Sequence, residues 1–112
     1  MLYIVIILFA LAAVVGFIIL KNWLTSATTA RTTVYLHGTF AALALIILVI
    51  YALQNTSHYP KASIILFIVA ALVGFYMFSE DLRKKYSPMW LAFTHALFAI
   101  AGFLLLLFFV FG

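Results

Sequence analysis

The sequence predicts an all-α membrane protein, an antiparallel four-helix transmembrane bundle built from a tandem duplication of a helical hairpin. Composition is the first reason, because 70% of the 112 residues are hydrophobic, 7% are charged and the mean hydropathy is +1.36. Soluble domains carry about 25% charged residues, so this composition excludes a soluble domain. The division of the chain into four apolar stretches is the second reason, and an internal repeat is the third.

Four apolar stretches predict four transmembrane helices, at 2–22, 33–53, 62–79 and 89–111. Each has about 18 to 23 residues, and at a rise of 1.5 Å per residue about 20 residues cross a hydrocarbon core of about 30 Å. The connections between them are too short to hold a soluble domain, so neighbouring helices are expected to run antiparallel. We therefore expect a single transmembrane domain that covers residues 1–112.

Basic residues concentrate at two of the three connections. Those at the first and third connections are Lys21, Arg31, Arg83, Lys84 and Lys85. Lys61 alone stands beside the second connection. The positive-inside rule then places the first and third connections in the cytoplasm, and both chain ends outside. The net charge of +4 follows from this arrangement and indicates no nucleic-acid surface, and the absence of cysteine excludes disulfide and thiolate-metal chemistry.

An internal repeat relates the two halves of the chain, 1–57 and 58–112. Residues 6–17 (IILFALAAVVGF) match residues 64–75 (IILFIVAALVGF) at nine of twelve positions, with an offset of 58 residues. Random pairing within so apolar an alphabet gives roughly one or two matches. We therefore predict duplicated hairpins related by a pseudo-twofold axis along the membrane normal. Since the first stretch corresponds to the third, it is expected to be a retained helix and not a cleaved signal peptide.

Two histidines, His37 and His95, correspond to each other under this repeat. Both lie about five to seven residues from the cytoplasmic ends of their helices, roughly 7 to 10 Å below that surface. An imidazole buried there needs partners for its nitrogens, and ionisable groups inside a membrane are functional by default. With the helices in sequential order, the second and fourth are diagonal, about 12 to 14 Å apart. That separation suits two imidazoles with an iron between them.

Small and aromatic residues accompany both histidines. On the histidine faces they follow at spacings of three and four residues, and on the first and third helices a Gly-Phe pair lies at the same depth. A porphyrin on the diagonal needs room at a glycine and packs on a phenylalanine, while its propionates would reach the basic cytoplasmic surface. The candidate cofactor-binding residues are His37, His95, Gly16, Gly74, Phe40, Phe98, Phe17, Phe75, Ala41, Ala99 and Arg31, with His37 and His95 as metal ligands.

Through these two histidines and their glycines, the chain resembles a membrane-bound b-type cytochrome, in which a four-helix bundle holds haem between paired histidines. The resemblance covers all four helices at the level of architecture. It implies one bis-histidine haem b and one-electron transfer with a quinone or a redox protein near the cytoplasmic face. Two nitrogen ligands close both axial positions and favour electron transfer over oxygen binding. A second haem is not expected, because His58 has no intramembrane partner.

The sequence leaves a second class of function open. Histidines inside a membrane often hydrogen-bond between helices, and small residues are common wherever membrane helices pack closely. The chain would then be a non-catalytic four-helix subunit of a larger complex, an assembly factor or a small transporter, surrounded by membrane lipid and alone or as a homo-oligomer. No carboxylate lies inside a predicted helix, which argues against a small proton-coupled exporter. Whether the chain is an oxidoreductase component stays open at this point.

Overall fold

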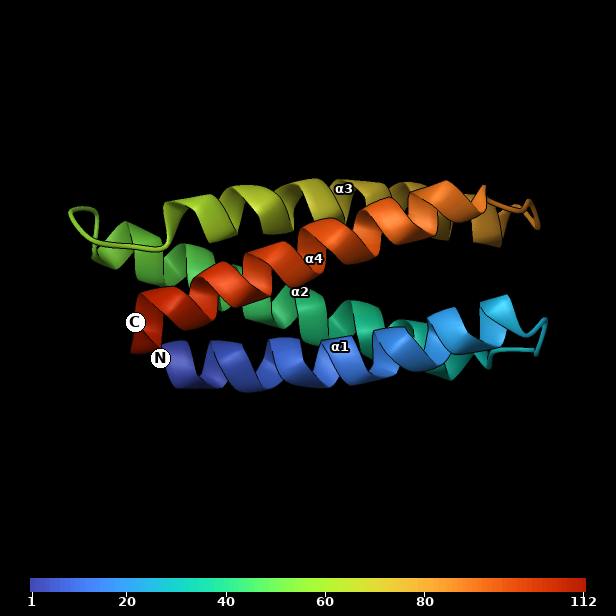
Figure 1. The fold of residues 1–112 in the computed structure, drawn as a ribbon, viewed down its shortest axis with the longest axis horizontal. Coiled ribbons are helices and arrows are strands. Elements are labelled where there is room, and N and C mark those ends of the chain that lie inside the picture. Colours follow the sequence, from blue (N-terminus) through green and yellow to red (C-terminus); the bar gives the residue numbers. More distant parts are fainter. The chain divides into compact units, whose positions relative to one another are not determined.

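The computed structural model describes all 112 residues. It contains four α-helices and no strand (Figure 1). They are α1 (Leu2–Leu24), α2 (Arg31–Gln54), α3 (Lys61–Leu82) and α4 (Met89–Phe111). All four are long and apolar enough to cross a membrane. The predicted all-α, multi-pass membrane protein is therefore confirmed.

The helices extend beyond the predicted apolar stretches by up to three residues. The largest difference is at the end of α3, which was expected to stop at residue 79 and continues through Glu80 and Asp81 to Leu82. Hydropathy marks only the part of a helix that lies in hydrocarbon, whereas backbone hydrogen bonds continue into the polar interface. The polar ends of transmembrane helices are therefore missed by an apolar window.

Within each half of the chain, two helices pack side by side as a helical hairpin (Figure 1). The chain divides into two compact units, Met1–His58 and Tyr59–Gly112. This division falls within one residue of the boundary between the two sequence repeats.

A narrow seam holds each hairpin together. In the first unit, the buried residues are Val5, Phe9, Ala12, Ala44 and Leu48. Their spacing of three and four residues places them on one face of each helix. The other apolar side chains of these two helices are exposed or half-buried on the hairpin, which suits helices that face lipid or further helices.

The seam of the second unit uses the equivalent positions. Its members at an offset of 58 residues are Ser63, Phe67, Ala70, Gly102 and Leu106. Two of the five positions differ in residue type between the units, yet all five are buried in both. The two halves of the chain therefore share a packing pattern as well as a sequence pattern.

The helices α1 and α3 end in the same hydrogen-bonded turn. Ser26 donates its N–H to the carbonyl of Trp23 at 3.2 Å, and Ala27 donates to Asn22 at 2.7 Å. In the second unit, Lys84 and Lys85 make the equivalent bonds, at 3.0 and 2.9 Å. These pairs of bonds form the Schellman motif, in which one residue adopts a left-handed conformation. Glycine usually fills that place, but here Ser26 and Lys84 do, each with φ of 58°.

Replacement of Ser26 by glycine should stabilise the first hairpin. A non-glycine residue at φ of 58° carries a steric cost that glycine avoids, so Ser26→Gly is expected to raise the free energy of unfolding by up to about 1 kcal/mol. Unfolding in detergent micelles, followed by circular dichroism, measures the change. The control is Thr25→Gly, at a φ of −97°, which should not stabilise; equal gains from both variants would contradict the assignment.

Candidate functional site

The imidazole of His37 hydrogen-bonds to the backbone of the neighbouring helix in its hairpin. Its Nδ1 lies 2.8 Å from the carbonyl oxygen of Ala12, a buried residue of α1. A carbonyl oxygen can only accept a hydrogen bond, so Nδ1 carries the proton and donates it. The half-buried ring is thereby tied to α1 at a defined height on the helix.

The ring of His37 also lies directly over Gly16, one helical turn after Ala12. A Cβ atom placed on Gly16 would be 2.9 Å from Cε1 and 3.1 Å from Nδ1 of His37. Carbon atoms cannot approach so closely without displacement of the ring. Gly16 has an ordinary helical backbone, without a positive φ. Glycine is therefore needed at this position for space and not for its conformational freedom.

The second hairpin contains the same arrangement. Nδ1 of His95 lies 2.7 Å from the carbonyl oxygen of Ala70, and a Cβ on Gly74 would be 3.0 Å from Cε1 of His95. Each member is 58 residues beyond its counterpart in the first hairpin. We call the two groups histidine clasps: His37, Ala12 and Gly16 form the first, and His95, Ala70 and Gly74 form the second.

The hydrogen bond sets the chemistry of each ring. When Nδ1 of a neutral imidazole is the donor, the lone pair resides on Nε2, which can accept a proton or bind a metal. Metal-binding histidines commonly donate their other nitrogen to a backbone carbonyl, and this bond fixes both the tautomer and the orientation of the ring. In each clasp, the lone pair of the neutral ring therefore lies on Nε2.

The glycines play a different part from the one that the sequence suggested. Gly16 and Gly74 were expected to leave room for the edge of a porphyrin, but the space beside each of them holds the imidazole of its own hairpin. The histidine and the glycine at equal depth are thus direct neighbours.

The remaining predicted residues surround the clasps at different degrees of exposure. The half-buried ones are Phe40, Ala41, Phe98 and Ala99, and the exposed ones are Phe17, Phe75 and Arg31. Within each hairpin, the alanine side chains continue the histidine face along the helix. Arg31 is the first residue of α2, at the end of the helix nearer to His37.

Two members of the clasps were not foreseen. Ala12 and Ala70 contribute their backbone carbonyls, which no side-chain motif reveals, although both lie within the repeated segment of nine identities. No group of three or more histidine, cysteine, aspartate or glutamate side chains lies within reach of a common metal ion.

Comparison of the chain with family models, curated proteins and solved structures gives no match. The two clasps and their chemistry are therefore the features of the chain that bear on its function.

Substitution of Gly16 by alanine should displace the His37 ring. The added Cβ would meet Cε1 at 2.9 Å, so Gly16→Ala is expected to lower the free energy of unfolding by about 1 to 3 kcal/mol and to break the bond to Ala12. Gly38 supplies a matched control, because its Cβ would meet nothing within 4 Å. Gly38→Ala should stabilise by up to about 1 kcal/mol through helix propensity. Equal effects in an unfolding titration would show that no clasp exists.

Proposed function

We propose that the chain is a small integral membrane protein that binds one haem b, with His37 and His95 as its two axial ligands. The main support is that both imidazoles donate Nδ1–H to a helix carbonyl. This bond places the lone pair of each neutral ring on Nε2. The two histidines are equivalent under the repeat, so a single cofactor with two like ligands suits them. In this proposal the four helices form an antiparallel bundle of duplicated hairpins.

The clasps fit the requirements of haem ligation. A ligand ring must be held in one tautomer and one orientation, and the carbonyls of Ala12 and Ala70 do both. The bond also makes Nε2 a stronger donor, because it draws electron density toward the ring. Haem held by His37 and His95 would supply reversible one-electron transfer. The residues of the chain hold the iron, exclude water and set the polarity around it.

The orientation in the membrane follows from the basic residues in this proposal. The cytoplasmic connections are residues 25–30 and 83–88, because the exposed cations of α1, α2 and the third connection gather there. Both clasps lie in the halves of their hairpins nearer to these connections. Arg31 is then placed to pair with a propionate, and a quinone or a redox protein would exchange the electron near the cytoplasmic face.

The same hydrogen bond also supports a second function, in which it serves only to hold the two helices of a hairpin together. Each clasp joins the two helices of one hairpin through a side chain and a backbone group, which is a common way to hold membrane helices together. The chain would then serve as a non-catalytic subunit, an assembly factor or a small transporter. The haem proposal requires Nε2 to bind iron, whereas the structural role requires nothing of Nε2.

The absorbance spectrum of the purified protein tests the haem proposal. The protein should be red, with a Soret band and sharp α and β bands on reduction. We expect His37→Ala and His95→Ala each to abolish the six-coordinate spectrum, whereas His58→Ala should leave it intact, because His58 is exposed in the second connection. A colourless protein that remains folded would reject the proposal and support the structural role.

Replacement of His37 by asparagine separates its role as a metal ligand from its role as a hydrogen-bond donor to Ala12. Its side-chain amide can donate to the Ala12 carbonyl in place of Nδ1–H but offers no nitrogen lone pair at the position of Nε2. We expect His37→Asn to lose the haem spectrum and to keep its stability within about 1 kcal/mol of the parent chain. His37→Ala should lose both, with a decrease of about 1 to 3 kcal/mol. A His37→Asn protein with an unchanged spectrum would exclude His37 as a ligand.

A further inference from the structure

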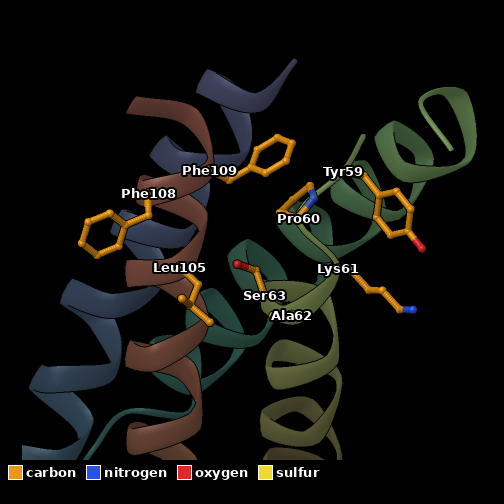
Figure 2. Close-up of a pocket in the computed structure, with 8 residues that line it drawn as sticks. All are labelled: Tyr59, Pro60, Lys61, Ala62, Ser63, Leu105, Phe108 and Phe109. Carbon is orange, nitrogen blue, oxygen red and sulfur yellow. The ribbon is translucent and has the colours of Figure 1, made fainter. Parts of the chain in front are cut away.

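An open cavity of about 330 Å³ lies in the second hairpin, where α3 begins and α4 ends (Figure 2). Its walls are residues 59–63 and, from α4, Leu105, Phe108 and Phe109. The walls are mainly apolar. Besides Tyr59, they include two polar side chains, Lys61 and Ser63, that neither the clasps nor the haem proposal uses. The cavity is therefore a separate feature of the molecule.

Ser63 is a buried hydroxyl without a hydrogen-bond partner. Its side chain is 1% exposed, and Oγ is the one buried side-chain polar atom of the chain that lacks a partner. Figure 2 shows the hydroxyl directed toward α4, on the side of Leu105 and Phe109. Leaving such a group unpaired costs about 1 to 3 kcal/mol. An acceptor from outside the chain would remove this cost.

The start of its own helix does not satisfy the hydroxyl of Ser63. Serine in a membrane helix usually donates to a carbonyl three or four residues earlier. Because α3 begins at Lys61, those carbonyls belong to Pro60 and Tyr59, which precede the helix. They accept the backbone N–H groups of Ile64 at 3.1 Å and Lys61 at 2.8 Å. Neither carbonyl accepts the Ser63 hydroxyl, which is directed toward α4 (Figure 2).

Lys61 lacks a side-chain carboxylate to pair with. The only two acidic side chains of the chain are Glu80 and Asp81, at the opposite end of α3. Nineteen residues at helical rise place Glu80 about 29 Å away. An ammonium group beside an apolar cavity at the end of a membrane helix attracts the phosphate of an anionic lipid.

The first hairpin shows that neither polar residue is required by the fold. At the equivalent positions it has Tyr3 in place of Lys61 and Val5 in place of Ser63. Val5 is fully buried in the seam, so an apolar side chain packs there without difficulty. The two polar residues of the cavity therefore belong to the second hairpin alone and indicate a ligand that only this hairpin binds.

We propose that this cavity binds one anionic phospholipid. The phosphate lies at the Lys61 ammonium, and Ser63 donates its Oγ–H to an ester carbonyl of the same lipid. Ser63 is two residues further into the membrane than Lys61, about 3 Å along the helix, and ester carbonyls lie just below the phosphate in a bilayer. The acyl chain runs along Leu105 and Phe108, which are 41% and 70% exposed. This site does not depend on the haem proposal.

Native mass spectrometry of the full chain in detergent tests the site. The probe is phosphatidylglycerol, with phosphatidylcholine as the uncharged competitor in an equimolar mixture. We expect one phosphatidylglycerol per chain, retained about ten-fold more than phosphatidylcholine, which corresponds to about 1.4 kcal/mol. Ser63→Val and Lys61→Gln should each reduce its retention about five- to ten-fold. Equal retention of the two lipids by the parent chain would overturn the proposal.

Two control measurements test whether a loss of lipid has another cause, namely a general loss of positive charge or a loss of stability. Lys21→Gln removes an exposed cation at the other end of its hairpin and should leave retention unchanged. Ser63→Val copies the residue of the first hairpin, so in lipid-free detergent it should unfold at the same or a higher denaturant concentration. If Ser63 holds only a water molecule, Ser63→Val will retain the lipid fully, and the proposal fails. A Ser63→Val protein that unfolds earlier would also overturn it, because the hydroxyl would then have a partner in the chain.

Discussion

The hydrogen bond from a histidine Nδ1 to an alanine carbonyl is the interaction on which the rest of each hairpin depends. Hydrocarbon offers no water to satisfy an imidazole N–H, so the ring must find an acceptor in the protein. The acceptor is a helix carbonyl, which the ring reaches only by lying against the helix axis, 2.8 Å from Ala12 in the first unit. That approach excludes a side chain one turn further on, at Gly16. The bond thereby sets the height at which the two helices meet and requires a glycine one turn beyond the acceptor.

The bond alone does not explain why the side chain is histidine. A hydroxyl or an amide can also donate to a carbonyl, so a link between two helices does not by itself require an imidazole. Imidazole differs in having a second nitrogen, whose lone pair is defined once Nδ1 is the donor. The two units keep histidine here, at His37 and His95, although the nearby turns differ in residue type, with Ser26 in one and Lys84 in the other. The ligand role that we propose for Nε2 would account for that difference.

Much of this arrangement follows from sequence, and the remainder depends on atoms that sequence patterns do not describe. Hydropathy predicts four helices, and the repeat predicts that each histidine shares its depth with a glycine. The direct contact could not be predicted, because the partner of the ring is the backbone of Ala12 or Ala70. The extension of α3 to Leu82 depends on the interface and not on hydrophobicity. Ser63 resembles any serine near a helix start, and only the three-dimensional arrangement shows that its hydroxyl has no acceptor.

The two ends of the second hairpin have diverged unequally from the first. At the end that holds the clasp and the Schellman turn, contacts are kept even where residues differ. At the other end, the exchanges of Tyr3 for Lys61 and Val5 for Ser63 introduce a charge and an unpaired hydroxyl within one turn of each other. Ser63 lies seven residues before Ala70, about 10 Å along α3. A lipid bound at Ser63 would therefore order the helix that carries the acceptor of the second clasp, and would do so in one hairpin only.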